Sequence, residues 1–213
     1  MSGSIKEARL GLPERLLRGF AYCLVHTVQR PDVRGVKPPL NEPTIFACNH
    51  VGLMDPVVLM VEYYDMMVRP LVAKDYFDKN AFTRRFYPIA QCIPIDRRKA
   101  STQWLQDSIS ALQKGESLII YPEGTRNKAG SGLLPFHTGT ALLAAESGAR
   151  IVPVYNAMWH FPHRYRLAIG EPLRLGTPGP GKPQSEWLRE QTEKNRSAID
   201  ALEEIVKILK RLF

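Results

Sequence analysis

The chain has 213 residues, of which 44% are hydrophobic and 23% charged, which suits a single globular domain able to bury a core. Basic residues outnumber acidic ones by 29 to 21, which favours an anionic partner: nucleic acid, anionic lipid headgroups or a phosphorylated substrate. The basic residues lie in amphipathic flanks rather than in stretches interleaved with aromatic residues, so nucleic acid is not expected as a partner.

The three cysteines, Cys23, Cys48 and Cys92, are widely spaced and stand in apolar contexts. They have neither CxxC nor Cys/His spacing, so we predict small core residues in a reducing compartment and no metal site. The N-terminus lacks the apolar region of a signal peptide, and no run of 18 apolar residues predicts a membrane span.

Residues 13–30 have the periodicity of an amphipathic helix that ends at Pro31. Its apolar stripe consists of Leu16, Leu17, Phe20, Ala21, Leu24, Val25 and Val28. Three arginines, Arg15, Arg18 and Arg30, fall off this stripe. The pattern fits either a helix packed on its own domain or a membrane anchor. The turn-rich residues that follow, up to Pro43, are expected to lead into the first strand.

The apolar residues 44–48 predict a buried strand, and a helix is expected over about 56–64. Between them lie His50 and Asp55. Asp55 before Pro56 fits a helix N-cap with proline at the first helical position, and His50 could be a satisfied core histidine. Alternatively, Asp55 accepts from one imidazole nitrogen and leaves the other to take a proton from a substrate hydroxyl.

Strands and helices alternate along the rest of the chain, which predicts an α/β fold with a mostly parallel sheet covered by helices. The expected strands are residues 69–73, 92–95, 118–121, 151–155 and 165–170. The expected helices are residues 77–87, 101–114 (capped by Ser101) and 138–148.

A linker rich in proline and glycine is expected over 172–183, followed by a helix over the last thirty residues. Its apolar stripe is Ile199, Leu202, Ile205, Val206, Leu209, Leu212 and Phe213. The helix either docks on the domain or meets a partner or membrane.

Two further loops that follow predicted strands carry chemistry suited to an anion. Arg97 and Arg98 leave the strand at 92–95, either as surface charges or with one guanidinium holding an oxyanion. In the loop 121–127, Gly124 lets the backbone turn beside the hydroxyl of Thr125 and the guanidinium of Arg126. These groups suit a phosphate, although a generic turn would look similar.

Together the motifs resemble those of the glycerolipid acyltransferases, the lysophosphatidic acid acyltransferase (1-acylglycerol-3-phosphate O-acyltransferase) family. Residues 50–55 look like its HxxxxD motif. Residues 92–97, 121–126 and 151–154 are similar to its second, third and fourth motifs, in the family's order. The resemblance covers residues 44–172 and implies acyl transfer from a thioester of acyl-carrier protein or coenzyme A to a lysophospholipid hydroxyl. No cofactor is implied beyond this co-substrate.

The resemblance also implies the roles of the site residues. His50 would be the general base and Asp55 would hold its tautomer, with the oxyanion expected to bind a backbone N–H near the His50 turn. Arg97 and Arg126 would contact the acceptor phosphate, and Glu123 would orient the arginines or bind a glycerol hydroxyl.

The remaining acceptor positions are Gly124 and Thr125, together with Lys74, which is either a basic position typical of the family or a solvated lysine. Two departures affect the expected acceptor. Gly52 stands where the family often has serine, and His137 stands where lysine or arginine is common. A histidine carries charge only part of the time near neutral pH, so its affinity for phosphate should fall as pH rises.

The resemblance as a whole favours phosphatidic acid as the product. The alternatives are acylation of another lyso-lipid, such as a lyso-ornithine lipid or a lysophospholipid with a larger headgroup, and a non-catalytic lipid-binding protein. Because the acceptor is a lipid, we expect a peripheral enzyme on the cytoplasmic face of the cell membrane, with an anionic membrane surface as partner. The expected organisation is a membrane-association segment at 1–40, a catalytic core at 41–175, and a linker with a C-terminal helix at 176–213.

Overall fold

The computed structural model describes residues 11–64, 66–96, 102–129, 132–157 and 164–212, with side chains described as far as residue 207. The strands are β1 (Asp32–Gly35), β2 (Thr44–Cys48), β3 (Val68–Ala73), β4 (Ile93–Ile95), β5 (Ser117–Ile120), β6 (Arg150–Asn156) and β7 (Arg166–Ile169). The helices are α1 (Leu12–Val28), α2 (Asp55–Glu62), α3 (Lys74–Phe77), α4 (Ala81–Ile89), α5 (Gln103–Gln113), α6 (Gly139–Ser147) and α7 (Gln184–Leu212).

The strands form one seven-stranded sheet in the order β1-β7-β6-β2-β5-β3-β4. Every neighbouring pair is parallel except β6 and β7, which are antiparallel. The predicted α/β fold with a mostly parallel sheet is confirmed. The central strand β2 is buried along its whole length, as expected of a strand that is covered on both faces.

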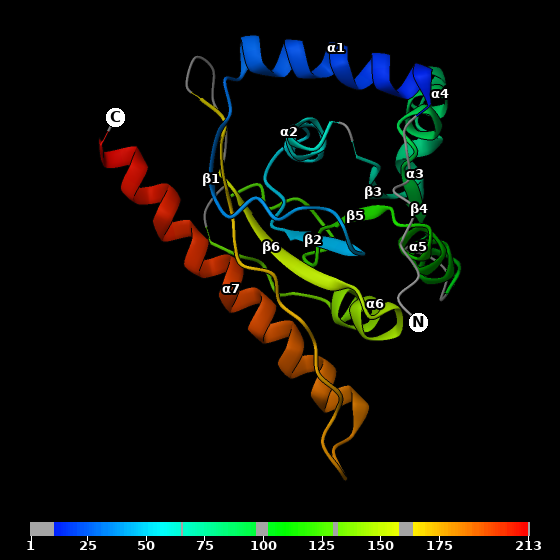
Figure 1. Ribbon diagram of the computed structural model, residues 1–213, viewed down its shortest axis with the longest axis vertical. Coiled ribbons are helices and arrows are strands. Elements are labelled where there is room, and N and C mark those ends of the chain that lie inside the picture. The colour runs from blue at the N-terminus through cyan, green and yellow to red at the C-terminus, as the bar shows by residue number, and fades with distance from the viewer. Residues whose placement is uncertain (1–10, 65, 97–101, 130–131, 158–163, 213) are drawn as a thin grey trace.

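Helices cover the two faces of the sheet in separate layers (Figure 1). In β2, Phe46 and Cys48 point to the side covered by α2, whereas Ile45 and Ala47 point to the side where α6 and α7 pack. The side chains alternate because successive residues of a strand point to opposite faces of the sheet. The helix α1 contacts α2 and lies outside it, so it forms an additional layer.

The edge strand β1 was not predicted, because residues 31–43 were expected to form only turns. Residues 32–35 pair in parallel with residues 166–169 of β7. This strand has four residues, is only partly buried and ends at Gly35. It therefore shows no apolar alternation by which a strand could be recognised.

The helix predicted over 77–87 is two helices, α3 and α4. Between them Asn80 adopts an extended backbone, with φ of −159°, and its side chain accepts from the N–H of Thr83 at 2.8 Å. The Thr83 hydroxyl in turn accepts from the N–H of Asn80, so α4 begins with a reciprocal cap. The predicted Ser101 cap lies outside the described residues, and α5 follows Thr102.

The terminal helix α7 packs on the sheet, so the first of its two interpretations, a helix docked on the domain, is confirmed. Ile199, Leu202 and Val206 are buried in the core with residues of β2 and β6. Ile205 remains 41% exposed. The side chains of Leu209, Leu212 and Phe213 lie outside the described ones.

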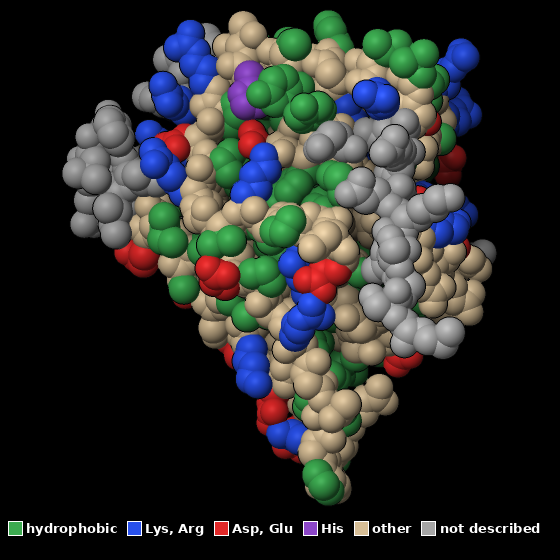
Figure 2. Space-filling model, viewed as in Figure 1, with side chains coloured by type: hydrophobic (Ala, Val, Ile, Leu, Met, Phe, Trp, Pro, Cys, Tyr) green, Lys and Arg blue, Asp and Glu red, His purple; other side chains and the backbone are tan. Residues whose placement is uncertain are grey.

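The N-terminal helix α1 is present as predicted, but much of its apolar stripe is exposed: Val25 is buried and Leu17 and Ala21 are half-buried, whereas the other four stripe residues are exposed. The exposed apolar side chains along it include Leu12, Leu16, Phe20, Leu24 and Val28. Figure 2 shows hydrophobic side chains protruding along this edge of the molecule, with Lys and Arg near its ends.

Arg18, which was expected on the polar face of α1, is buried against the protein. Its guanidinium donates to the carbonyl oxygens of Met66 at 2.6 Å and Val68 at 3.0 Å. Within the described residues, no helix is both long enough and apolar enough to cross a bilayer.

Candidate active site

The predicted site loops converge at the carboxyl ends of adjacent strands, the usual ligand position of an open α/β sheet. His50 follows β2, and the loop from Tyr121 to Arg126 follows β5, which pairs with β2. They line a cavity of about 1130 Å³ that extends between α1, α2, α4 and β3. Among its apolar lining residues are Leu17, Ala21, Met60, Leu71, Phe86 and Trp104.

His50 and Asp55 form the predicted hydrogen-bonded pair, with His50 Nδ1 lying 2.9 Å from Asp55 Oδ2. The Asp55 side chain is completely buried, whereas that of His50 is 19% exposed. An ionised carboxylate can only accept a hydrogen bond, so the proton of the neutral imidazole is on Nδ1 and the lone pair on Nε2. This tautomer is the one required of a base.

Asp55 does not cap α2, which corrects the structural interpretation of this residue. It is the first residue of the helix, and the preceding residue, Met54, occupies the N-cap position. The carboxylate turns back into the loop, where Oδ2 also accepts from the N–H groups of Val51 and Gly52, both at 2.8 Å. The carboxylate therefore organises the turn that carries His50.

Gly52 approaches Asp55 closely. A Cβ atom at this position would lie 3.0 Å from Asp55 Oδ1, a tight contact. The departure from serine therefore falls directly beside the Asp55 carboxylate.

Glu123 is buried and holds two loops through their backbone. Its Oε1 accepts from the N–H of His50 at 3.0 Å, and its Oε2 accepts from the N–H of Leu134 at 3.3 Å. Burial raises the pKa of Glu123, although these backbone hydrogen bonds lower it in part. The predicted contacts of Glu123 were with arginines or a glycerol hydroxyl, whereas the contacts found fix the position of His50.

The backbone N–H groups at the His50 turn are thereby occupied. Those of His50, Val51 and Gly52 donate to Glu123 or Asp55. A backbone N–H near this turn was expected to bind the oxyanion. These three N–H groups already donate within the protein, so none of them is available for that role in this arrangement.

The imidazole of His50 also rests on an aromatic ring. The ring of Tyr121 stacks on it with centroids 4.1 Å apart and planes inclined by 24°. Burial raises the pKa of the Tyr121 hydroxyl. The stacked ring and the Asp55 carboxylate together restrict both the tilt and the rotation of the imidazole.

The third motif places its polar groups at the cavity. Gly124 has φ of +65°, and a Cβ there would lie 3.0 Å from the His137 ring. Thr125, Arg126 and His137 all line the cavity with His50. The loop is tied to the turn that carries His50, because the N–H of Asn127 donates to the His50 carbonyl at 2.7 Å.

Of the two remaining predicted residues, only Lys74 is among the described residues, and it lies outside the site. Lys74 is exposed at the start of α3 and is not among the cavity-lining residues, which agrees with the solvated alternative. Arg97 lies outside the described residues.

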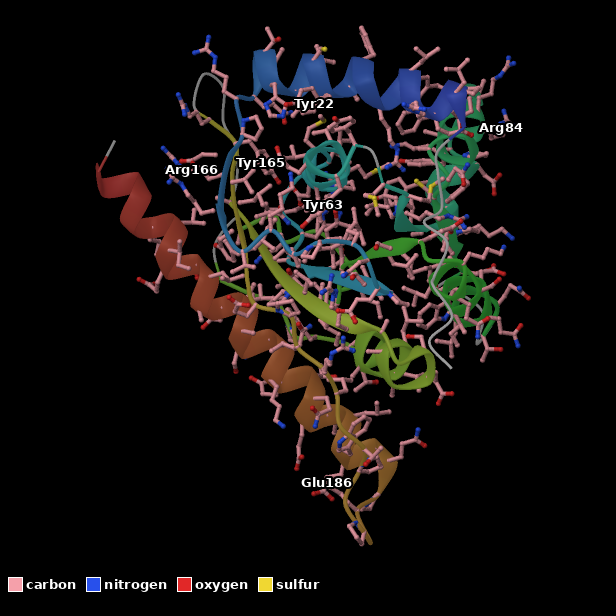
Figure 3. The ribbon with its side chains drawn as sticks, viewed as in Figure 1. Tyr22, Tyr63, Arg84, Tyr165, Arg166 and Glu186 are labelled. Atoms are coloured by element: carbon pink, nitrogen blue, oxygen red, sulfur yellow. The ribbon has the colours of Figure 1, made fainter. Side chains whose placement is uncertain are left out.

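Three residues of the site were missed. The side chain of Asn49 donates to the carbonyl of Asn156 at 2.9 Å, and Asn156 returns two hydrogen bonds to Asn49. The buried Tyr165 donates to Asp55 Oδ1 at 2.8 Å and approaches Asn156 Oδ1 at 3.2 Å. Figure 3 labels Tyr165, which directly precedes β7. The two asparagines could have been recognised in the sequence, because each stands at the end of an apolar strand. No feature of the sequence around Tyr165 distinguishes it from other core tyrosines.

A histidine hydrogen-bonded to a buried aspartate, at a cavity with an apolar wall and cationic groups, is an arrangement typical of α/β enzymes that activate a nucleophile. The acyltransferase family model matches residues 26–157, and the chain belongs to this family.

Among its relatives is the 1-acyl-sn-glycerol-3-phosphate acyltransferase of Bacillus subtilis, 27% identical over 174 residues, with 78% of this chain and 83% of the relative covered. The coconut palm (Cocos nucifera) enzyme of the same name is 31% identical over 127 residues, and the match covers 40% of its length. The crystal structure of PlsC from Thermotoga maritima, a 1-acyl-sn-glycerophosphate acyltransferase, superposes with a TM-score of 0.62. It has 19% identity, and the match covers 92% of this chain and 84% of that structure.

Proposed function

We propose that this protein transfers a fatty acyl chain from a thioester to the sn-2 hydroxyl of lysophosphatidic acid, which gives phosphatidic acid. The hydrogen bond of 2.9 Å between His50 Nδ1 and Asp55 Oδ2, beside a large apolar cavity, carries the proposal. The related 1-acyl-sn-glycerol-3-phosphate acyltransferases support the choice of acceptor.

In the proposed reaction His50 Nε2 takes the proton of the acceptor hydroxyl while its oxygen attacks the thioester carbonyl carbon. The tetrahedral intermediate then collapses, the carbon–sulfur bond breaks, and the imidazolium returns the proton to the departing thiolate. Asp55 stabilises the imidazolium through Nδ1. A general base of this kind contributes roughly 10²- to 10⁴-fold to the rate.

The phosphate of the acceptor is assigned to the third motif. Arg126 offers a guanidinium fork, Thr125 a hydroxyl, and the turn at Gly124 brings the backbone close. Arg97 is proposed as a second guanidinium. Lys74 is the weakest of the proposed phosphate contacts, because it is exposed and away from the cavity lining.

The acyl chain is assigned to the apolar part of the cavity. The donor is a thioester of either acyl-carrier protein or coenzyme A. The alternative acceptors are a lyso-ornithine lipid or a lysophospholipid with a larger headgroup. His137 lies beside Gly124. A neutral imidazole attracts a phosphate less than a lysine would, so acceptors other than lysophosphatidic acid are included in the test.

The segment 1–40 is proposed to hold the enzyme on an anionic membrane surface through α1. Leu16, Phe20 and Leu24 lie on one exposed face of this helix, and Arg15 and Arg30 are exposed beside it. Phe82, 70% exposed on α4, adds a further apolar contact. Thioesters of acyl-carrier protein and coenzyme A are cytoplasmic compounds, so we propose the cytoplasmic face.

The test is thiol release by purified protein given acyl-coenzyme A or acyl-acyl-carrier protein and a panel of lyso-lipid acceptors. We expect release that requires an acceptor and is greatest with lysophosphatidic acid, and a loss of at least 10²-fold for His50→Ala. Greater activity with a lyso-ornithine lipid or a lysophospholipid would favour the alternative acceptor. The proposal fails if wild type is inert with every acceptor or if His50→Ala is as active as wild type.

A further inference from the structure

We propose that Tyr165 is a positioning residue that acts on the proposed base, His50, through Asp55. This inference rests on the proposed function, since it assigns a role in the same proton transfer. The starting observation is the hydrogen bond of 2.8 Å from the Tyr165 hydroxyl to Asp55 Oδ1, between residues far apart in the sequence.

The Tyr165 hydroxyl has one proton and two neighbouring acceptors, Asp55 Oδ1 at 2.8 Å and Asn156 Oδ1 at 3.2 Å. The Asn156 amide cannot turn round to donate to it, because its NH₂ group donates to the Asn49 carbonyl at 3.0 Å. The proton therefore goes to the closer acceptor, which also bears the charge. Burial, and secondly the charge of Asp55, raise the pKa of Tyr165, so the hydroxyl keeps its proton.

The bond completes the set of donors around a fully buried carboxylate. The Oδ2 atom of Asp55 accepts from His50 Nδ1 and from the N–H groups of Val51 and Gly52, whereas Oδ1 accepts from Tyr165. Donors on both oxygens fix the rotation of the carboxylate about its Cβ–Cγ bond. This rotation decides whether Oδ2 points at the imidazole.

Tyr165 is itself held from three sides. Its N–H donates to the Gln29 carbonyl at 2.8 Å, and its carbonyl accepts from the N–H of Asp32 at 2.7 Å. Its side chain packs in the core beneath α2 and is 1% exposed. The hydroxyl thus lies at a defined position relative to Asp55, as expected of a group that orients a catalytic side chain.

The primary variant is Tyr165→Phe, which removes one hydroxyl and keeps the ring. The matched control is Tyr155→Phe, because Tyr155 is also buried and its pKa is also raised by burial and by a neighbouring carboxylate, that of Glu203 on α7. We expect kcat to fall about tenfold for Tyr165→Phe, which corresponds to about 1.4 kcal/mol, with KM for both substrates within about twofold. The control should keep wild-type kcat and KM.

The pH profile separates positioning from a general structural effect. Loss of the Tyr165 donor leaves more negative charge on Asp55, which favours the imidazolium of His50. We therefore expect the acid limb of kcat/KM to move to higher pH in Tyr165→Phe but not in Tyr155→Phe. In the Asp55→Asn background, Tyr165→Phe should cause no further loss.

A measurement on the unaltered protein decides the matter even if Tyr165→Phe does not fold. We expect the ring carbon of Tyr165 that bears the hydroxyl, followed by NMR, to change its chemical shift with the same midpoint as the His50 imidazole. A flat Tyr165 signal through that titration would overturn the inference, and so would equal kinetics in the two tyrosine variants. Both results presuppose an active wild type, whereas an inert wild type contradicts the proposed function itself.

Discussion

The two terminal helices, α1 and α7, have the same kind of sequence, but they bury their apolar stripes to different extents. Each has an apolar stripe beside basic residues. In α7 the stripe residues Ile199 and Leu202 are buried, whereas in α1 the stripe residues Leu16 and Phe20 are 66% and 70% exposed. The helix α7 lies directly on β6 and β7, while α1 lies on α2, which already covers the sheet. Apolar periodicity therefore shows that a helix has two faces, but not which face the domain buries.

The largest effect should come from the buried stripe of α7. Ile199 is fully buried in the core, and Ile199→Ala leaves a cavity there. We expect a loss of about 2–5 kcal/mol in the free energy of unfolding, measured by urea denaturation. Leu16→Ala in α1 is the matched change and should stay within about 0.5 kcal/mol. Equal losses in the two variants would contradict the difference between the helices.

The next effect concerns the polar attachment of α1. Arg18→Met keeps much of the side-chain volume but removes the donors to the Met66 and Val68 carbonyls. We expect a loss of about 1–3 kcal/mol of stability, and faster proteolysis within α1. Arg15, exposed on the same helix, provides the control, since Arg15→Met should change neither quantity. An unchanged Arg18→Met would mean that its packing, rather than its hydrogen bonds, holds the helix.

A third prediction concerns the exposed face of α1. Phe20→Ser should leave stability almost unchanged but weaken binding to vesicles that contain anionic lipid by about tenfold, about 1.4 kcal/mol, since one aromatic side chain no longer inserts. Sedimentation with the vesicles measures this binding. Ile205→Ser on α7 is the control, because Ile205 is 41% exposed but lies on the other terminal helix. If both variants bind as wild type does, α1 is not the membrane contact.

The smallest effect is a loss of stability at alkaline pH, which we expect from Tyr155 beside α7. Burial, followed by the charge of Glu203, raises the pKa of Tyr155 above its usual value of 10.0. Above pH 10 the unfolded chain loses this proton while the folded protein retains it, so stability falls as pH rises. Between pH 9 and pH 10.5 this proton should account for just under ~1 kcal/mol of the fall in the free energy of unfolding of the wild type. Tyr155→Phe should lack that part of the fall, which thermal or urea unfolding at each pH measures. An identical pH dependence in the variant would contradict the assignment.

Much of the site could be predicted because its residues are close together in the chain. His50 and Asp55 lie on one turn between a strand and a helix, and Gly124 to Arg126 occupy another. Parallel strands then bring the two loops to the same edge of the sheet. The contacts of Glu123 were not predictable in this way, since its partners are the backbone N–H groups of His50 and Leu134. Backbone groups leave no trace in the side-chain pattern.

The sequence by itself determined the α/β class, most of the helices and strands, and the pairing of His50 with Asp55. These follow from local periodicity, from turn-forming residues and from side-chain chemistry over a few positions. Only the tertiary structure decided that Arg18 is buried, that much of the apolar stripe of α1 is exposed, and that Tyr165 donates to Asp55. Each of these depends on which surface lies opposite a given residue, and that surface comes from a distant part of the chain.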